Sequence, residues 1–198
     1  MITFLNLSNS SPFIRLKKKF DEAVANAQTN VEAAVISSFN SAHNEVSSRY
    51  VNIKFIDNES LIFFSNYESK KAQDINSHDQ VSVVFYWNVI NTQIRIKGKI
   101  SKTSLEFNKN YFKDRSVDKN ALAISSNQSQ TISSYEEVVK KYEKVRSSSD
   151  LSECPEFWGG YVIKPYEIEF WKGNSFRLNK RVFYKFENNI WHHSILEP

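Results

Sequence analysis

The sequence has little cysteine and little glycine, and each shortage excludes a kind of protein. The single cysteine, Cys154, excludes an internal disulfide and favours a reducing compartment. Only four glycines in 198 residues leave no glycine-rich phosphate loop, so side chains must bind any phosphate. No apolar run approaches the ~20 residues of a membrane span, and the first residues lack a secretory signal pattern. We therefore expect a cytoplasmic protein without a membrane partner.

Aromatic and basic residues are what the sequence has in quantity. The 15 Phe, 9 Tyr and 4 Trp can build the core of one globular domain, which we predict to span residues 1–198. The formal charge of +4 suits an anionic ligand. Because Lys and Arg are spread along the chain, nucleic acid is not an expected partner. His192 and His193 would point to opposite faces of a strand, so we expect no metal site.

The spacing of apolar residues predicts a mainly β fold with flanking helices. Residues 1–30 are predicted to form an N-terminal helical arm. Strands are predicted at 31–39, 49–56, 61–65, 81–87, 93–100, 158–171 and 177–191, and helices at 105–113, 122–132 and 135–145. Residues 57–60, 159–160 and 173–174 are predicted as turns. Pairing between strands from both ends of the chain implies an antiparallel sheet, closed on itself, with helices packed outside.

Two helical or loop segments carry specific expectations. An apolar stripe in the helix at 135–145 is predicted to belong to the core. It consists of Tyr135, Val138, Val139, Tyr142 and Val145. The polar, serine-rich segment 147–154 is predicted to be a mobile loop within the domain, because the strands after it are too few to form a core alone.

Residues 177–181 carry the strongest chemical signal. They place Arg177 and Arg181 on one short segment behind Trp171. A guanidinium group pairs bidentately with phosphate or carboxylate, and an indole ring offers a wall for a flat ligand. Taken alone, the segment is more typical of an edge strand with solvated charges. The other motifs of the chain favour the functional interpretation.

Those motifs occur in a fixed order along the chain. They are Arg49-Tyr50-Val51-Asn52-Ile53-Lys54, Phe63-Phe64-Ser65-Asn66-Tyr67-Glu68-Ser69-Lys70-Lys71, Phe85-Tyr86-Trp87, Gln93-Ile94-Arg95-Ile96-Lys97-Gly98, Tyr111-Phe112, Gln128-Ser129, Phe157-Trp158-Gly159-Gly160, Glu169-Phe170-Trp171 and Leu196-Glu197-Pro198. In this order they resemble the pyridoxine/pyridoxamine 5'-phosphate oxidase family, over residues 49–198. The resemblance implies an FMN-binding split β-barrel that works as a homodimer, with FMN at the subunit interface.

The resemblance also implies roles for individual residues. The residues that would hold the FMN phosphate and ribityl chain are Arg49, Lys70, Lys71, Gln128 and Ser129, and those around the isoalloxazine are Phe64, Ser65, Gln93, Trp171 and Arg181. The residues that would bind the substrate's 5'-phosphate are Lys54, Tyr111, Arg115 and Lys119. Arg177 and Asn179 would lie beside the pyridine ring as catalytic residues. The implied reaction is oxidation of pyridoxamine or pyridoxine 5'-phosphate to pyridoxal 5'-phosphate, with dioxygen as electron acceptor.

Several positions depart from the family pattern, all on the substrate side, and the family's acidic-Pro pair before the first strand is missing around Val31-Glu32. Asn179 and Lys180 stand where the family has His and Asp, while Ser116 and Lys119 replace a Pro and a phosphate-binding Ser. These departures leave two alternatives open. One is an FMN oxidase of the same family that acts on another ring, as phenazine-pathway oxidases do. The other is a non-catalytic protein that binds flavin or pyridoxal phosphate.

Overall fold

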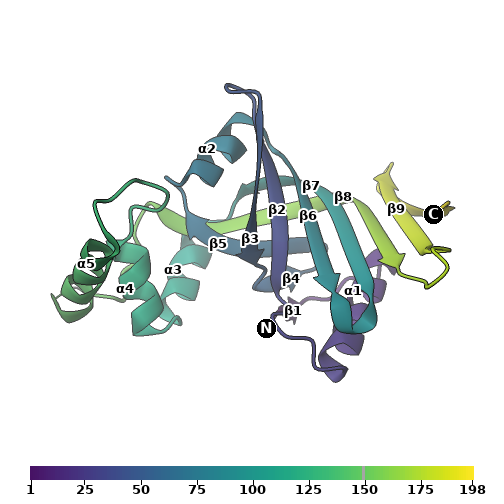
Figure 1. The fold of residues 1–198 in the computed structure, drawn as a ribbon, viewed down its shortest axis with the longest axis horizontal. Helices are drawn as coiled ribbons and strands as arrows, with labels where there is room; N and C mark the ends of the chain where they lie inside the picture. The colour runs from purple at the N-terminus through teal and green to yellow at the C-terminus, as the bar shows by residue number, and fades with distance from the viewer. Residues whose placement is uncertain (149) are drawn as a thin grey trace.

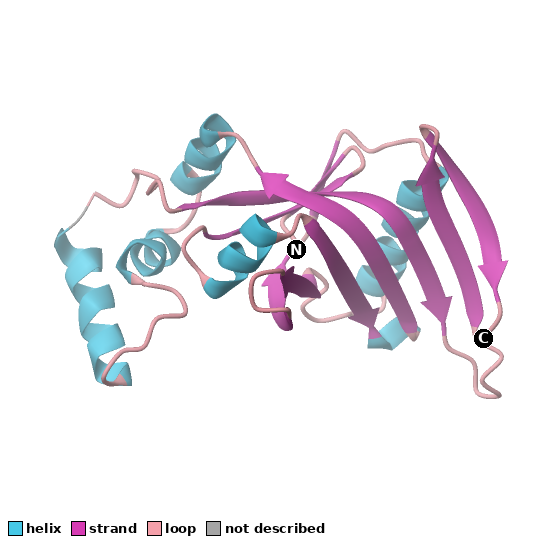
Figure 2. Cartoon of the chain, turned by 90° about the horizontal axis from the view of Figure 1, so that it is seen from above, coloured by secondary structure: helices cyan, strands magenta, loops and turns pink. Residues whose placement is uncertain are grey.

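The computed structural model describes residues 1–148 and 150–198, and a ten-stranded sheet forms the body of this described part (Figures 1 and 2). The strands are β1 (Thr3–Leu5), β2 (Ala33–Asn40), β3 (Glu45–Asn52), β4 (Phe55–Asp57), β5 (Ser60–Asn66), β6 (Gln80–Trp87), β7 (Thr92–Lys102), β8 (Trp158–Lys172), β9 (Lys180–Glu187) and β10 (Ile190–Leu196). The helices are α1 (Ser11–Ala25), α2 (Lys70–Ser77), α3 (Leu105–Lys113), α4 (Val117–Ser125) and α5 (Tyr135–Ser148), with a short 3-10 turn at Asn88–Ile90.

Strand β8 is the element around which the sheet is organised. The strand order is β1-β4-β5-β8-β7-β6-β2-β3, and β9 pairs with the later half of β8 and carries β10 on its other side. The pairing of β7 with β8 shifts register next to Gly98, where a Cβ would lie 2.8 Å from the Lys164 carbonyl oxygen. A glycine there allows the two strands to bend together, so β8 can pair with β5 in its first half and β9 in its second.

The sheet is not closed, because its two ends are joined by the chain and not by a ladder. Strand β3 lies at one end of the strand order, and the chain passes through only Ile53 and Lys54 to β4, near the other end. The Lys54 N–H donates to the Ile62 carbonyl at 2.8 Å, and the Thr3 N–H donates to the Lys54 carbonyl at 2.9 Å. The predicted mainly β fold with flanking helices is confirmed, but the expected closure is wrong, and the β1–β4 pair is parallel.

Three local predictions were wrong. Gly159 and Gly160 lie inside β8, and the strand predicted at 177–191 is instead the β9–β10 hairpin, whose turn residues Asn188 and Asn189 both have positive φ. The helix predicted at 122–132 lies earlier, as α4. By contrast, the turn at 57–60 is confirmed, since Asp57 pairs with Ser60 across the β4–β5 hairpin.

Helices α1 and α5 differ in how they meet the rest of the molecule. Helix α1 buries Phe13, Leu16 and Phe20 in the main core, where the Phe20 ring meets Trp87 edge to face. Helix α5 buries none of its described side chains, and Tyr135 is 76% exposed. The helical spacing was right, but the prediction that the α5 stripe is core was wrong for this chain.

The remaining organisational predictions stay open. The arm at 1–30 contains β1 as well as α1. In the segment 147–154, Ser147 and Ser148 end α5, residue 149 lies outside the described residues, and 150–154 have no regular structure. Its mobility and the single-domain assignment remain predictions. None of the helices in the described part has the length and apolar content that crossing a bilayer would require.

Candidate functional site

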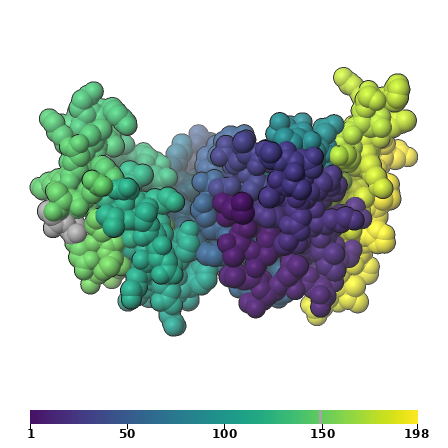
Figure 3. Space-filling model, turned by 90° about the horizontal axis from the view of Figure 1, so that it is seen from below, coloured from purple at the N-terminus to yellow at the C-terminus, as the bar shows by residue number. Residues whose placement is uncertain are grey.

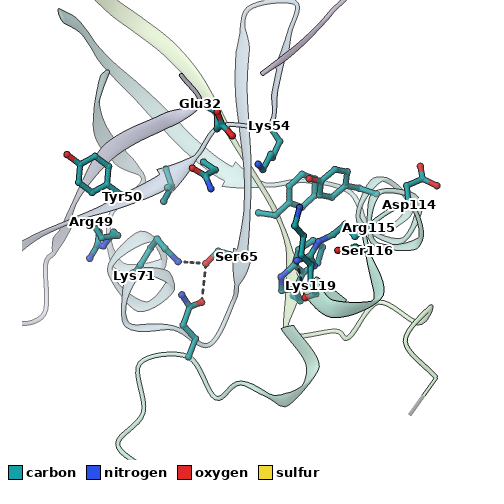
Figure 4. Close-up of a pocket in the computed structure, with 16 residues that line it drawn as sticks. Glu32, Arg49, Tyr50, Lys54, Ser65, Lys71, Asp114, Arg115, Ser116 and Lys119 are labelled. Atoms are coloured by element: carbon teal, nitrogen blue, oxygen red, sulfur yellow. Dashed lines mark hydrogen bonds between the residues drawn. The ribbon is translucent and has the colours of Figure 1, made fainter. Parts of the chain in front are cut away.

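A cavity of about 650 Å³ opens where β3 and β5 face the segment that joins α3 to α4 (Figure 4). Its lining includes nine of the residues predicted to bind cofactor or substrate. They are Arg49, Lys54, Phe64, Ser65, Lys71, Tyr111, Arg115, Lys119 and Gln128. Its other lining residues are Tyr50, Val51 and Asn52 of β3, Asp114 and Ser116 between α3 and α4, Trp158 at the start of β8, and Glu32 before β2.

The cations of the cavity form two groups. Figure 4 shows Arg49 and Lys71 on one side and Arg115 and Lys119 on the other, with Lys54 between them. Cations that line one cavity repel one another unless anions balance them. The arrangement therefore fits two separate anionic groups, one at each side.

On the first side, Lys71 is buried with little compensation. It is 6% exposed and donates hydrogen bonds to the hydroxyls of Ser65 and Ser69, the latter at 3.1 Å. Burial, and after it the nearby charge of Arg49, lowers the pKa of Lys71 to about 8. An anion bound here would favour the charged ammonium group.

The start of α2 explains why Lys71 lies at this place. Strand β5 ends at Asn66, and Ser69 caps the helix by accepting a hydrogen bond from the Ala72 N–H. Lys70 and Lys71 thus lie in the first helical turn, where the helix dipole favours negative charge and opposes cations. Two lysines and free N–H groups at one helix start form a surface suited to an anion.

Arg49 is held from outside the cavity by a buried carboxylate. Its Nη1 donates to Ser38 Oγ at 2.5 Å and its Nη2 to Asp74 Oδ2 at 3.3 Å. Asp74 is 1% exposed and also accepts hydrogen bonds from Ser38 and Asn40. Burial alone would raise the pKa of Asp74, but these hydrogen bonds outweigh it and hold the pKa below its usual value.

The second side is an aromatic wall with a guanidinium group on it. The rings of Phe64 and Tyr111 stack with centroids 3.8 Å apart, and Trp158 stacks on Phe64 at 5.2 Å. The Nη2 of Arg115 donates to the Lys119 carbonyl at 3.2 Å. Its Nη1 is buried and has no hydrogen-bond partner among the described residues, and burial lowers the pKa of Arg115. A buried unpaired donor beside Lys119 suits an anionic acceptor.

A buried polar network fixes this wall. The Oδ1 of Asn108 on α3 accepts hydrogen bonds from the Gly160 N–H at 2.8 Å and the Thr103 hydroxyl at 2.6 Å, while its Nδ2 donates to the Tyr67 hydroxyl. A Cβ on Gly159 would overlap both Tyr67 and Asn108. Glycine at this position therefore lets α3 approach β8. Its role is this close approach within a paired strand, and not a turn.

The other predicted residues do not reach this cavity. Lys70 and Ser129 line a smaller hollow of about 330 Å³. Gln93, Trp171 and Arg181 are neighbours in one row across β7, β8 and β9. The Arg181 Nε donates to Glu169 at 2.7 Å.

Arg177 and Asn179 lie in the loop between β8 and β9, where the Asn179 side chain accepts a hydrogen bond from the Asn174 N–H at 3.1 Å. Figure 1 and the space-filling view in Figure 3 place this C-terminal part of the molecule at the opposite end from the helices α3 to α5. One chain therefore presents two separate groups of predicted residues.

Sequence reasoning gave no role to Asp74 or Asn108. The only signal for either was a polar residue on the face of a helix that also carries buried apolar residues, Ile75 for α2 and Phe112 for α3. Among the described residues, no group of three or more His, Cys, Asp or Glu side chains is placed to hold a metal ion.

The open sheet, with a cavity between its strand β3 and the helical segment, is the split barrel of FMN-binding type. A family model described as pyridoxamine 5'-phosphate oxidase matches residues 20–149. A second, described as the pyridoxine 5'-phosphate oxidase C-terminal dimerisation region, matches residues 158–198. The chain belongs to the pyridoxine/pyridoxamine 5'-phosphate oxidase family.

Individual relatives agree with this assignment. The pyridoxine/pyridoxamine 5'-phosphate oxidase 2 of Hydrogenovibrio crunogenus is 34% identical over 195 residues, covering 98% of this chain and 91% of that protein. The pyridoxine/pyridoxamine 5'-phosphate oxidase of Colwellia psychrerythraea is 34% identical over 193 residues, covering 96% and 88%.

Solved structures share the fold. PhzG from Burkholderia lata, in complex with tetrahydrophenazine-1-carboxylic acid, has a TM-score of 0.89 at 26% identity and covers 96% of this chain and 93% of its own. A pyridoxamine 5'-phosphate oxidase-related, FMN-binding protein from Nostoc punctiforme has a TM-score of 0.76 at 13% identity, covering 92% and 97%. At that identity the likeness shows the fold alone.

Proposed function

We propose that this protein is an FMN-dependent oxidase that converts pyridoxamine or pyridoxine 5'-phosphate to pyridoxal 5'-phosphate, with dioxygen as electron acceptor. Membership of an oxidase family supports the reaction class. The observation that carries the proposal is the cavity with a separate cationic group on each side, because cofactor and substrate each bring one phosphate.

The residues of the first side fit the flavin. Arg49 and Lys71 would pair with its phosphate, and Gln128 and Ser65 would donate or accept hydrogen bonds further along. Lys70 lines the neighbouring hollow at the start of α2 and would add positive charge from there. This side lacks a negative charge that would stabilise the buried ammonium group of Lys71, whose pKa is lowered by burial. When bound, FMN supplies a hydride acceptor for the substrate's C4′ carbon, and its reduced form is reoxidised by dioxygen.

The residues of the second side fit a phosphorylated substrate. Arg115 and Lys119 on this side and Lys54, which lies between the two sides, supply three positive charges. The buried Nη1 of Arg115 is a donor without a partner among the described residues. A phosphate monoester carries close to two negative charges at neutral pH and three acceptor oxygens. Anchoring the substrate by that group would orient its ring, so that binding energy is converted into alignment with the flavin.

A second copy of the chain would complete the site. The match of residues 158–198 to a dimerisation region supports a homodimer. In such a dimer, the row of Gln93, Trp171 and Arg181 would close the partner's cavity over the flavin ring, and Arg177 and Asn179 would lie beside the substrate. This arrangement accounts for the distance between the two groups of predicted residues in one chain.

A second candidate is an oxidase of the same family that acts on a different ring. The likeness to PhzG, whose structure holds a tetrahydrophenazine carboxylic acid, favours it, as do the departures at Ser116, Lys119, Asn179 and Lys180. The charge of the second side favours the phosphate, because a carboxylate brings only one negative charge to three cations.

Anaerobic reduction of the purified protein tests these candidates together. We expect a flavin absorption spectrum that bleaches on addition of pyridoxamine 5'-phosphate and not of unphosphorylated pyridoxamine. A protein that binds no flavin after reconstitution with FMN would overturn the proposal that FMN is its cofactor. A flavin bleached only by a reduced phenazine carboxylic acid would favour the second candidate, and a flavin bleached by neither would favour a non-catalytic binding protein.

A further inference from the structure

We infer that Asp74 is a positioning residue for the cofactor, which holds Arg49 in the orientation needed to bind the flavin phosphate. This inference rests on the proposed binding of FMN. Asp74 does not line the cavity, so it would act through Arg49 and not on the ligand itself.

The hydrogen bonds around Asp74 all point toward its carboxylate. Arg49 Nη2 and Ser38 Oγ both donate to Oδ2, at 3.3 and 2.8 Å, and Asn40 Nδ2 donates to Oδ1 at 3.1 Å. Ser38 has a single hydroxyl proton, which it gives to Asp74, so its oxygen is left to accept from Arg49 Nη1 at 2.5 Å. The guanidinium group is thus held at two of its nitrogens, directly and through Ser38.

This arrangement requires both side-chain oxygens of residue 74 to accept hydrogen bonds. An asparagine has the same shape but offers one acceptor and one NH₂ group, which cannot receive a hydrogen bond. In Asp74→Asn, the new NH₂ would therefore face either the donors Arg49 and Ser38 or the donor Asn40. In the first orientation the donors face each other, and Arg49, whose side chain is 24% exposed, is the neighbour free to move. In the second orientation Asn40 loses its acceptor, and Arg49 keeps only a neutral amide oxygen in place of a carboxylate, which holds it less strongly.

The direction in which FMN affinity changes when Asp74 is replaced distinguishes a positioning role from a purely electrostatic one. Asp74 is an anion close to a site proposed for an anion, so by Coulomb's law alone its removal would strengthen FMN binding. If Asp74 acts by holding Arg49, its removal weakens FMN binding instead. The two explanations predict opposite changes in one dissociation constant.

The experiment measures FMN dissociation constants on apoprotein by the quenching of flavin fluorescence. For Asp74→Asn we expect FMN to bind about tenfold or more weakly than to the wild type, comparable to the loss in Arg49→Ala. The matched control is Asp79→Asn, which also removes an aspartate paired with a cation, Lys99, but on the surface. Its FMN affinity should equal that of the wild type.

A double-mutant cycle excludes a merely structural role. If Asp74 acts through Arg49, adding Asp74→Asn to Arg49→Ala should change FMN affinity by less than about twofold. If it only supports the fold near α2, the two losses should multiply. Ser38→Ala provides a milder second test that does not depend on the folding of the Asp74 variant, and we expect about a two- to fivefold loss.

Unchanged or tighter FMN binding in Asp74→Asn, or multiplied losses in the double variant, would overturn the inference. If Asp74→Asn does not fold, unchanged affinity in Ser38→Ala would overturn it. A wild-type protein that binds no FMN would overturn the proposed function itself, which is a separate result.

Discussion

The guanidinium carbon of Arg115 lies 4.3 Å from the centroid of the Trp158 ring. This contact orients a charged group that comes from the turn between α3 and α4, because Trp158 belongs to the start of β8 and is itself stacked on Phe64. Arg115 thus comes from the helical segment, but the orientation of its guanidinium group is set by a residue of the sheet.

Arg115 should distinguish phosphorylated from unphosphorylated substrates. Arg115→Ala removes charge-assisted hydrogen bonds worth roughly 1.5–3 kcal/mol, so we expect KM for pyridoxamine 5'-phosphate to rise about tenfold to a hundredfold. FMN affinity should change by less than about twofold, since Arg115 and Lys71 lie on different sides of the cavity. Steady-state kinetics and FMN titration measure the two effects. Equal wild-type activity on the phosphorylated and free forms of pyridoxamine would contradict this role.

Lys119 should add affinity for a doubly charged group. Its side chain is exposed, so its contribution is modest, and Lys119→Ser should raise KM for a phosphorylated substrate only about two- to fivefold. The effect should be smaller for a carboxylate ligand, which carries one charge. Inhibition constants for inorganic phosphate and for a ring carboxylate, measured on both proteins, make the comparison. An equal change for both ligands would count against a phosphate at this side.

FMN affinity should fall as the pH rises through about 8. Because the pKa of Lys71 is lowered to about 8 in the free protein, FMN must drive proton uptake by Lys71 above that pH, at a cost of up to about tenfold in affinity per pH unit. The charged neighbours of Lys71 are Arg49 and Asp74. Hydrogen bonds from Ser38, Asn40 and Arg49 outweigh burial and hold the pKa of Asp74 below its usual value, so Asp74 stays ionised over this range. Lys71→Arg should flatten the profile. A wild-type FMN affinity that is constant over this range would contradict the prediction.

Subunits with different defects should restore one another in a mixed dimer. If each cavity is completed by the partner's loop, co-expressing Arg115→Ala and Arg177→Ala chains gives mixed dimers with one intact site, and about a quarter of wild-type activity should return. Lys54→Ala with Arg115→Ala is the matched control, because both residues line the same cavity and no intact site can form. Recovery in the control, or none in the test pair, would refute the shared site.

Asn179 should make wild-type turnover slow while Arg177 remains essential. An amide can position a substrate but cannot exchange a proton near neutral pH as histidine can, and general acid–base catalysis is typically worth ~10²–10⁴ in rate. We expect Asn179→His to raise kcat for pyridoxine 5'-phosphate about tenfold or more, under saturating FMN and oxygen. No gain, together with negligible wild-type turnover, would favour a different ring substrate.

Local sequence patterns predicted the helices and strands better than they predicted which residues those elements bury and what packs against them. In the arm predicted to be helical, the apolar spacing from Phe13 to Val24 gave α1. Phe13, Leu16, Phe20 and Ala23 of that pattern are buried, whereas Ile14 and Val24 are exposed. The same kind of spacing gave α5 but not its exposure, because periodicity identifies a face without saying what covers it. Gly159 and Gly160 were predicted as a turn, yet they lie in a strand. Glycine is needed there because Tyr67, Asn108 and Thr103 occupy the space that side chains would fill.

The roles predicted for the site residues stay predictions, but the structure shows which of those residues lie together. Residues from β3, β5, α2 and α3 that the motifs singled out line one cavity. Asp74 could not be identified this way, since its place on the same helix face as Ile75 is a weak signal that does not reveal what the carboxylate contacts. Its partners Ser38 and Asn40 are more than thirty residues away and meet it only in the fold.

The hydrogen bond from the Thr3 backbone to the Lys54 carbonyl links the first strand to the cavity wall. Lys54 stands at the seam where the two edges of the split barrel meet, and β1 lies along that seam. Any widening of the seam would therefore displace a cation proposed to hold the substrate. A fusion tag or a truncation that disturbs β1 should therefore weaken substrate binding together with the core, because Ile2 is buried in that core and the Phe4 ring packs against Phe20 of α1.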